Sequence, residues 1–232
     1  MSLKDILHPK TSAGTLIRDI IVILLIVAVI GIVLFAVAGT WPAMVAVESG
    51  SMEPNITTYS LVFVVDENRF GGWQTQKEAL ASGAGTIFNG YGDVIVYQPN
   101  GITGVTPIIH RAITTITAEE AATDWNFTGD AAHAGVITKG DNPITNSAPD
   151  QAGYFARYGR MQPVKPEWIV GKAVFAIPFI GWIPLNIIPS ILIAIGIVVV
   201  IEIISHIVAK RKAASSANRR DKRNNTNKTK KQ

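Results

Sequence analysis

Two long apolar stretches stand out in the chain, one near each end, and short runs of mixed polarity lie between them. The first stretch, residues 20–39, holds twenty residues without a charge. A helix of that length spans about 30 Å, which matches the hydrocarbon core of a bilayer. A cleaved signal peptide has a shorter apolar region of about 7–15 residues. Although Ala36-Val37-Ala38 resembles a cleavage site, we therefore predict a retained transmembrane helix at 20–40.

The second apolar stretch, which we place at 184–208, has an uninterrupted centre at 191–201. Glu202, Ser205 and His206 fall in its last two turns. An ionisable residue inside a span is a candidate for function. Here the basic residues at 210–212 follow closely, so we interpret the three polar groups as lying at the membrane boundary. We predict a second transmembrane helix.

The region between the two stretches has the pattern of a β domain. Runs rich in Val, Ile and aromatic residues are separated by clusters of Gly and Pro, which favours short strands joined by turns. We expect strands at 60–65, 93–97, 108–117 and 169–177, and brief helices at 76–82 and 118–124. The predicted fold is mainly β: a small twisted or barrel-like β domain at 41–183, with a transmembrane helix on either side.

Charge is distributed unevenly along the chain, which predicts its orientation. Residues 210–232 carry ten basic residues and one acid, whereas residues 40–186 carry eight basic and thirteen acidic residues. Because Lys and Arg beside spans favour the cytoplasm, we predict that both termini, 1–19 and 209–232, are cytoplasmic and that the β domain is outside. We expect the polar tail at 209–232 to be disordered. A basic tail without a folded basic domain does not favour nucleic-acid binding.

Three polar motifs in the central region carry candidate chemistry. Ser51 follows Gly50 just outside the first span, where a tight turn could present its hydroxyl. His110 lies inside an apolar run that would hold an imidazole rigidly enough to act as a general base. Asp141 follows a second β-like run and could orient that imidazole. Each motif alone has an ordinary structural explanation, and the chain has no cysteine to offer another nucleophile or a disulfide.

Together, the segments SGSMEP, HR, GDVIVY and TKGDN resemble the motifs of the signal peptidase I family, in its archaeal and endoplasmic-reticulum branch. The resemblance covers residues 45–175 and the anchor before them. It implies that Ser51 is the nucleophile and His110, which replaces the lysine of the bacterial branch, is the general base. Asp141 matches the first of two family aspartates and Asp150 is the best match to the second, so either could orient His110. Ser49 and the Ser51 backbone N–H match the oxyanion donors.

The resemblance also implies a function: a membrane-bound serine endopeptidase that removes signal peptides from exported preproteins after small residues, with no metal or cofactor. Its partners would be preproteins and membrane lipid, with the protein translocation channel as a further candidate. The expected location is the plasma membrane, or the endoplasmic-reticulum membrane in a eukaryote. Two other functions stay open: a non-catalytic membrane-anchored β module that binds peptides or serves a secretion complex, and a related protease that trims another exported precursor.

Overall fold

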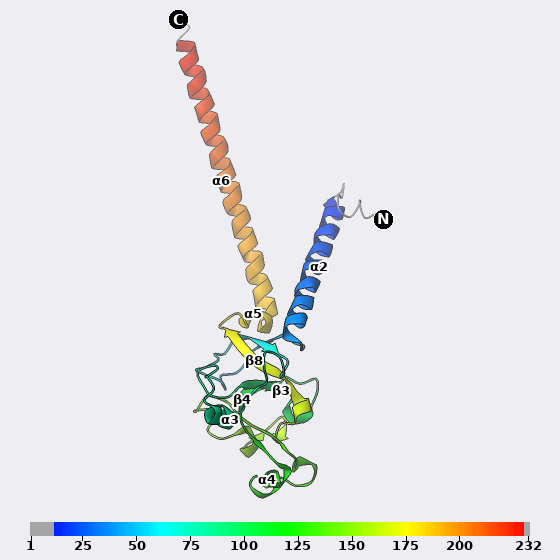
Figure 1. Ribbon diagram of the computed structural model, residues 1–232. Helices are drawn as coiled ribbons and strands as arrows, with labels where there is room; N and C mark the ends of the chain where they lie inside the picture. Colours follow the sequence, from blue (N-terminus) through cyan, green and yellow to red (C-terminus); the bar gives the residue numbers. More distant parts are fainter. Residues whose placement is uncertain (1–11, 230–232) are drawn as a thin grey trace. The chain divides into compact units, whose positions relative to one another are not determined.

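The computed structural model describes residues 12–229, and the chain divides into two compact units, Met1–Trp182 and Ile183–Gln232. The first unit contains an apolar helix and an antiparallel β domain, and the second contains one long helix (Figure 1). The helices and strands of the first unit are, in order, α2 (Ser12–Ala38), β1 (Met44–Ala46), β2 (Leu61–Val65), α3 (Gln76–Ser82), β3 (Val94–Tyr97), β4 (Ile108–Ile116), α4 (Ala118–Thr123), β5 (Gly135–Lys139), β6 (Tyr154–Phe155), β7 (Gly159–Arg160) and β8 (Ile169–Ile177).

Helix α2 covers the first predicted span up to Ala38, two residues short of the predicted end at 40, and starts eight residues before it, at Ser12. Its side chains are largely exposed, and Gly14–Ala38 is long and apolar enough to cross a membrane. The helix ends where Gly39 adopts a left-handed φ of +74°, as is common just after a helix C-terminus. The backbone N–H of Asp66 then donates to the Ala38 carbonyl at 2.8 Å, which joins the end of α2 to the residue after β2.

The second unit is built on α6 (Ile187–Thr229), after the short helix α5 (Trp182–Leu185) at the boundary between the units. Its first part, Ile187–Lys210, is also long and apolar enough to span a membrane. The helix continues to Thr229, through most of the tail that we predicted to be disordered. No Gly or Pro follows Gly196 in the sequence, so no strong helix breaker interrupts it. Residues 1–11 and 230–232, parts of both predicted cytoplasmic ends, lie outside the described residues.

Six strands form one antiparallel sheet in the order β1-β2-β8-β3-β4-β5, and β6 and β7 form a separate pair. The predicted strands at 60–65, 93–97, 108–117 and 169–177 are confirmed as β2, β3, β4 and β8, and the predicted short helices as α3 and α4. A capping box begins each of these two helices, with Thr75 and Thr117 as the N-caps. The β sheet is thus as expected, but with α2 and α6 the chain as a whole is mixed α and β rather than mainly β.

At β3 the sheet is packed on both faces, which explains why all four residues of this strand are buried. Val94 and Val96 face one core cluster, which includes Met52, and Ile95 and Tyr97 face another. The register pairs Ile95 with His110, so the imidazole is placed on the Ile95 and Tyr97 side of the sheet. The fold therefore holds His110 in a well-packed part of the molecule.

Candidate active site

His110 and Asp150 form a buried pair. His110 lies within β4 and is 4% exposed, and Asp150 begins a single 3₁₀ turn, Asp150–Ala152. The imidazole Nδ1 lies 2.7 Å from Asp150 Oδ2. Because a carboxylate oxygen accepts, Nδ1 carries the hydrogen and the neutral ring presents Nε2 as its basic nitrogen. In the described part of the chain, Nε2 has no hydrogen-bond partner, so it is free to take a proton.

Two buried hydroxyls hold the Asp150 carboxylate in place. Tyr97 Oη donates to Asp150 Oδ2 at 2.9 Å, and Thr138 Oγ1 donates to the same oxygen at 2.7 Å. Thr138 is in turn held by Gln151, whose Oε1 accepts the Thr138 backbone N–H at 3.0 Å. Burial raises the pKa of the Tyr97 hydroxyl well above its usual range, and the charge of Asp150 raises it further. Tyr97 therefore remains a protonated donor, and Asp150 points one fixed oxygen at the imidazole.

The other oxygen, Asp150 Oδ1, is buried and accepts no hydrogen bond from the residues that the structure describes. A buried carboxylate with an unsatisfied oxygen gains from a nearby positive charge. Protonation of His110 at Nε2 would supply that charge beside it. The pair is therefore suited to stabilise an imidazolium that forms transiently, which is the part an aspartate plays in a Ser-His-Asp triad.

Ser51 lies in a half-buried turn after β1, and residues beyond β5 hold it. The Ser51 carbonyl accepts the Asn142 backbone N–H at 2.9 Å, and the Gly50 carbonyl accepts the Asn142 side-chain amide at 2.7 Å. At the side-chain level, Ser49 Oγ donates to Ser51 Oγ at 3.3 Å. The two serine hydroxyls thus lie together, and Asn142 fixes the backbone of the turn through two hydrogen bonds.

Gly140 provides the close approach between this turn and the sheet. A Cβ on Gly140 would lie 2.5 Å from the Ser51 carbonyl oxygen and 2.6 Å from the Asn146 side chain, so only glycine fits there. Gly140 directly follows Lys139, which pairs with Arg111, the neighbour of His110. The end of β5 therefore seats the Ser51 turn beside the strand segment that carries His110.

Ser51 and His110 are not hydrogen-bonded to each other within residues 12–229, since the partner of the Ser51 hydroxyl is Ser49. In the absence of substrate, catalytic hydrogen bonds are often long or poorly aligned and tighten only when substrate binds. The structure thus forms the His110–Asp150 pair and seats the serine turn against Gly140 and Asn142, just after the strand that pairs with β4.

Within the described residues, the hydrogen-bond partner of the His110 imidazole is Asp150, and Asp141 has other partners. Its carboxylate binds Arg111 through two hydrogen bonds, from Nε to Oδ1 at 2.8 Å and from Nη2 to Oδ2 at 2.5 Å. Asn55 donates to the same carboxylate at 2.9 Å. The remaining N–H groups of Arg111 donate to backbone carbonyls of the loop at 87–92, namely those of Ile87, Phe88, Gly90 and Gly92. Asp141 therefore belongs to a structural clamp beside the serine turn.

Tyr97, Thr138 and Asn142 contribute to this arrangement and were not singled out by the sequence. Tyr97 ends the GDVIVY segment, and Thr138 and Asn142 belong to TKGDN, so all three lie inside motifs already noted. What the sequence could not provide was the pairing of β3, β4 and β5, which brings the Tyr97 and Thr138 hydroxyls to Asp150. No local pattern signals such contacts.

The geometry combines a buried carboxylate–imidazole pair, a free imidazole nitrogen and a turn with two serine hydroxyls. Such groups suit nucleophilic acyl transfer with general-base assistance. No protein-family model matches the chain, and no curated protein matches it. Any assignment of function therefore depends on the motifs and on the geometry of the site.

Proposed function

We propose that this protein is a membrane-anchored serine endopeptidase of the signal peptidase I type, which removes signal peptides from exported preproteins. The observation that carries the proposal is the buried His110–Asp150 pair, 2.7 Å apart, on the strand next to the seat of the Ser51 turn. A peptide-binding module without catalytic activity has no need of a buried carboxylate–imidazole pair with a free imidazole nitrogen. The SGSMEP and TKGDN motifs contribute the resemblance to the family.

The proposed reaction is acyl transfer through Ser51. Rotation about χ1 turns the Ser51 hydroxyl from Ser49 towards His110 Nε2, which takes the proton as Ser51 Oγ attacks the scissile carbonyl carbon. The Ser51 backbone N–H and the Ser49 hydroxyl donate to the oxyanion that forms. His110 then gives the proton to the leaving amine, and an acyl-enzyme remains. Water, deprotonated by His110, hydrolyses the ester and releases the signal peptide.

The two aspartates have different parts in this proposal. Asp150 holds His110 in the tautomer with a basic Nε2 and stabilises the imidazolium. Asp141 is a positioning residue: it fixes Arg111 and, through the next residue, Asn142, the two carbonyls of the serine turn. Loss of Asp150 should impair the chemical step directly, whereas loss of Asp141 should act through the stability of the turn.

The substrate is proposed to bind as an extended strand along β1. β1 is an edge strand, and the residues that flank it, Ala43 and Val47, are hydrogen-bonded to the β2 side: the Val64 N–H donates to the Ala43 carbonyl and the Val47 N–H donates to the Ser60 carbonyl. By the alternation of an antiparallel pair, the backbone groups of Met44 and Ala46 point away from β2 and are available to another strand. β1 leads within a few residues to Ser51. A preprotein segment added to this edge would thus be carried to the nucleophile.

An apolar sheet surface beside α2 supports a location close to the bilayer. Met44 pairs with Phe63, and Phe63 pairs with Phe175 and stacks on its ring at a centroid distance of 5.2 Å. Val62 and Val64, on either side of Phe63, face the core, so this row faces outward; Met44 is 39% exposed and Phe175 is 48% exposed. Phe63 also packs against the cluster formed by the last turn of α2. We propose that this face meets lipid where α2 leaves the membrane.

The proposed topology places both termini in the cytoplasm and the β domain outside, in the plasma membrane or the endoplasmic-reticulum membrane. Its basis is the charge distribution, together with two helices that could each cross a membrane. The proposed partners are signal-peptide-bearing preproteins and lipid, with the protein translocation channel as a further candidate. Tethering enzyme and substrate in one membrane raises their effective concentration.

The test is cleavage of a preprotein by the full chain in detergent. We expect the wild type to cut after a small residue and both Ser51→Ala and His110→Ala to lose activity by several orders of magnitude. Cleavage that persists in Ser51→Ala would refute the proposed nucleophile. Binding of the preprotein without any cleavage by the wild type would favour the non-catalytic module, and cleavage of a different exported precursor alone would favour the related protease.

A further inference from the structure

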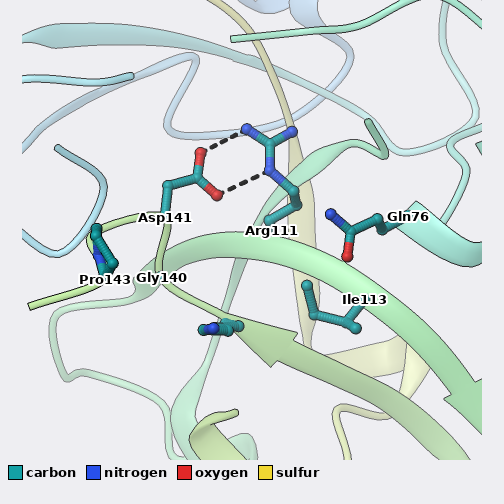
Figure 2. Close-up of a pocket in the computed structure, with 7 residues that line it drawn as sticks. Gln76, Arg111, Ile113, Gly140, Asp141 and Pro143 are labelled. Carbon is teal, nitrogen blue, oxygen red and sulfur yellow. Dashed lines mark hydrogen bonds and ion pairs between the residues drawn. The ribbon is translucent and has the colours of Figure 1, made fainter. Parts of the chain in front are cut away.

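A small cavity lies beside the serine turn and is not used by the proposed reaction. Its volume is about 190 Å³. It is bounded by the first residue of α3, by β4, and by the end of β5 with the turn after it, and the lining residues are Gln76, Arg111, Ile113, Lys139, Gly140, Asp141 and Pro143 (Figure 2). Drug-sized ligands occupy about 300–1,000 Å³. The cavity is therefore of a size for a single side chain.

Of the two cationic side chains that line this cavity, Arg111 and Lys139, only Lys139 is available to bind a ligand. Figure 2 shows Asp141 and Arg111 facing each other through their two hydrogen bonds. All the N–H groups of Arg111 are used by Asp141 and by the carbonyls of the 87–92 loop, so it has none to offer a ligand. Lys139, by contrast, has no ion pair or side-chain hydrogen bond in the part of the chain that the structure describes. Lys139 thus lines the cavity as a cation without an ion-pair partner among the described residues, beside a neutralised pair.

The rest of the lining suits a short acidic side chain. The Gln76 side-chain amide likewise makes no hydrogen bond to the described residues, so it can donate to a carboxylate. Ile113 and Pro143 provide apolar surface for methylene groups. A carboxylate would meet the Lys139 charge and the Gln76 donor, and a Glu or Asp stem would lie on the apolar part. A basic side chain would meet a like charge.

The cavity adjoins the end of β5, at the opposite edge of the sheet from β1. β1 and β5 are the two edges of the sheet, and the Ser51 turn joins them, because it follows β1 and contacts Gly140 just after β5. Gly140 is also part of the cavity wall. A peptide that lies along β1 up to Ser51 and continues past it is therefore directed to this cavity. In the proposed reaction, that continuation is the mature side of the cut.

We propose that this cavity is a subsite for an acidic side chain within the first few residues of the mature protein, with Lys139 as its specificity-determining residue. The proposal rests on the proposed function, because it requires a peptide bond cut at Ser51. It assigns no chemistry to Lys139. Its consequence is a preference among precursors according to the charge just after the cleavage site.

The test compares precursors that differ only in carrying Glu, Gln or Lys at the first, second or third mature position, cleaved by the full chain in detergent. At one of these positions we expect kcat/KM for Glu to exceed that for Gln by about threefold to tenfold, with Lys lowest, as for a partly desolvated ion pair. Lys139→Met should bring the Glu-to-Gln ratio to about one. Lys139→Glu should reverse the order, so that the Lys precursor is cleaved best.

Lys77→Met is the matched control, because Lys77 is an exposed lysine next to Gln76 on α3 that does not line the cavity. It should keep the wild-type ratio. Each ratio is taken within one variant, so partial loss of folded protein does not affect it. An unchanged ratio in Lys139→Met, or an equal loss of preference in Lys77→Met, overturns the subsite.

The two proposals fail in different ways. If the wild type cleaves the Glu, Gln and Lys precursors equally at all three positions, the subsite is wrong while the proposed protease stands. If the wild type cleaves no precursor, the proposed function fails and the subsite falls with it.

Discussion

Asp141 and Asp150 are nine positions apart, yet they have different surroundings. Asp150 accepts from His110, Tyr97 and Thr138 in a buried position, and Asp141 accepts from Arg111 and Asn55 at the edge of the sheet. Only the first arrangement can orient a general base. At the scale of single residues, the surroundings of each carboxylate decide its part in the proposed reaction.

Replacing each aspartate in turn with asparagine should distinguish the proposed role of Asp150 from that of Asp141. Asp150→Asn removes the acceptor that fixes the imidazole tautomer, and we expect kcat to fall by about 10⁴, the loss known for this change in a Ser-His-Asp triad. Asp141→Asn leaves the Arg111 guanidinium without its charge partner, so we expect mainly a lower stability, by about 3–5 kcal/mol. Preprotein cleavage and thermal unfolding measured on both variants check this. A larger loss of kcat in folded Asp141→Asn than in Asp150→Asn would contradict it.

Tyr97 should make the folded state sensitive to alkali. Its pKa is raised in the folded protein by burial and by Asp150, whereas an unfolded tyrosine titrates near pH 10. The folded state therefore holds the proton more tightly, so this contribution to stability is complete below about pH 10 and is lost as the pH rises further. Denaturant unfolding from pH 8 to 11 should show a fall above about pH 10 that is smaller in Tyr97→Phe. An equal fall in both proteins would contradict this.

At the scale of elements, the central feature is the contact between the end of β5 and the turn after β1. Asn142 binds the Gly50 and Ser51 carbonyls, and Gly140 lets the two segments approach. Strands at the two edges of an open sheet thus meet at the serine turn. This contact, more than the sheet itself, determines where Ser51, the proposed nucleophile, lies.

Gly140→Ala should therefore disable the site without unfolding the sheet. The added methyl would lie 2.5 Å from the Ser51 carbonyl oxygen, so the serine turn must shift, and a shift of about 1 Å can cost about 10²-fold in rate. Gly85→Ala is the control, because a Cβ there meets no atom within 4 Å. Cleavage rate and circular dichroism check both variants. Full activity of Gly140→Ala would show that the contact does not position Ser51.

Much of the sheet could be predicted from the sequence. The segments that form β2, β3, β4 and β8 are rich in Val, Ile and aromatic residues and are bounded by turns. β1 could not be predicted, since its three residues are too few to show alternation. The contact between Asp150 and His110 could not be predicted from the sequence either. The segment before Asp150, residues 142–149, is a loop, and only tertiary contacts decide which aspartate is hydrogen-bonded to His110. The tail at 209–229 is helical rather than disordered as predicted, because a polar sequence without helix breakers is compatible with both states.

At the scale of the whole molecule, one outward face of the β domain is apolar next to the end of α2. Met44 and Phe175 are exposed to solvent in the isolated chain although they lie in well-formed strands. An exposed apolar surface of this kind is costly in water and is explained if lipid covers it. The proposed site at Ser51 would then lie close to the membrane surface, where signal peptides end.

The absence of cysteine allows a direct test of this contact in a lipid nanodisc. Phe175→Cys places a single fluorescent label on the apolar face, and Ile144→Cys places one on a side chain that is 89% exposed in the loop after Asp141. We expect a lipid-borne quencher to act on the label at 175 and an aqueous quencher to act on the label at 144. Equal quenching by the aqueous agent at both positions would place the apolar face in water.

The central claim is that Ser51 becomes acylated by the preprotein, and one measurement tests it most directly. A precursor with an ester in place of the scissile amide makes acylation fast, so the acyl-enzyme accumulates and can be trapped by acid. Intact-mass measurement of the quenched protein should show an adduct of the signal-peptide mass less one water, mapped to Ser51 and absent from Ser51→Ala. Turnover of the precursor with no adduct, or with an adduct on another residue, would contradict the account.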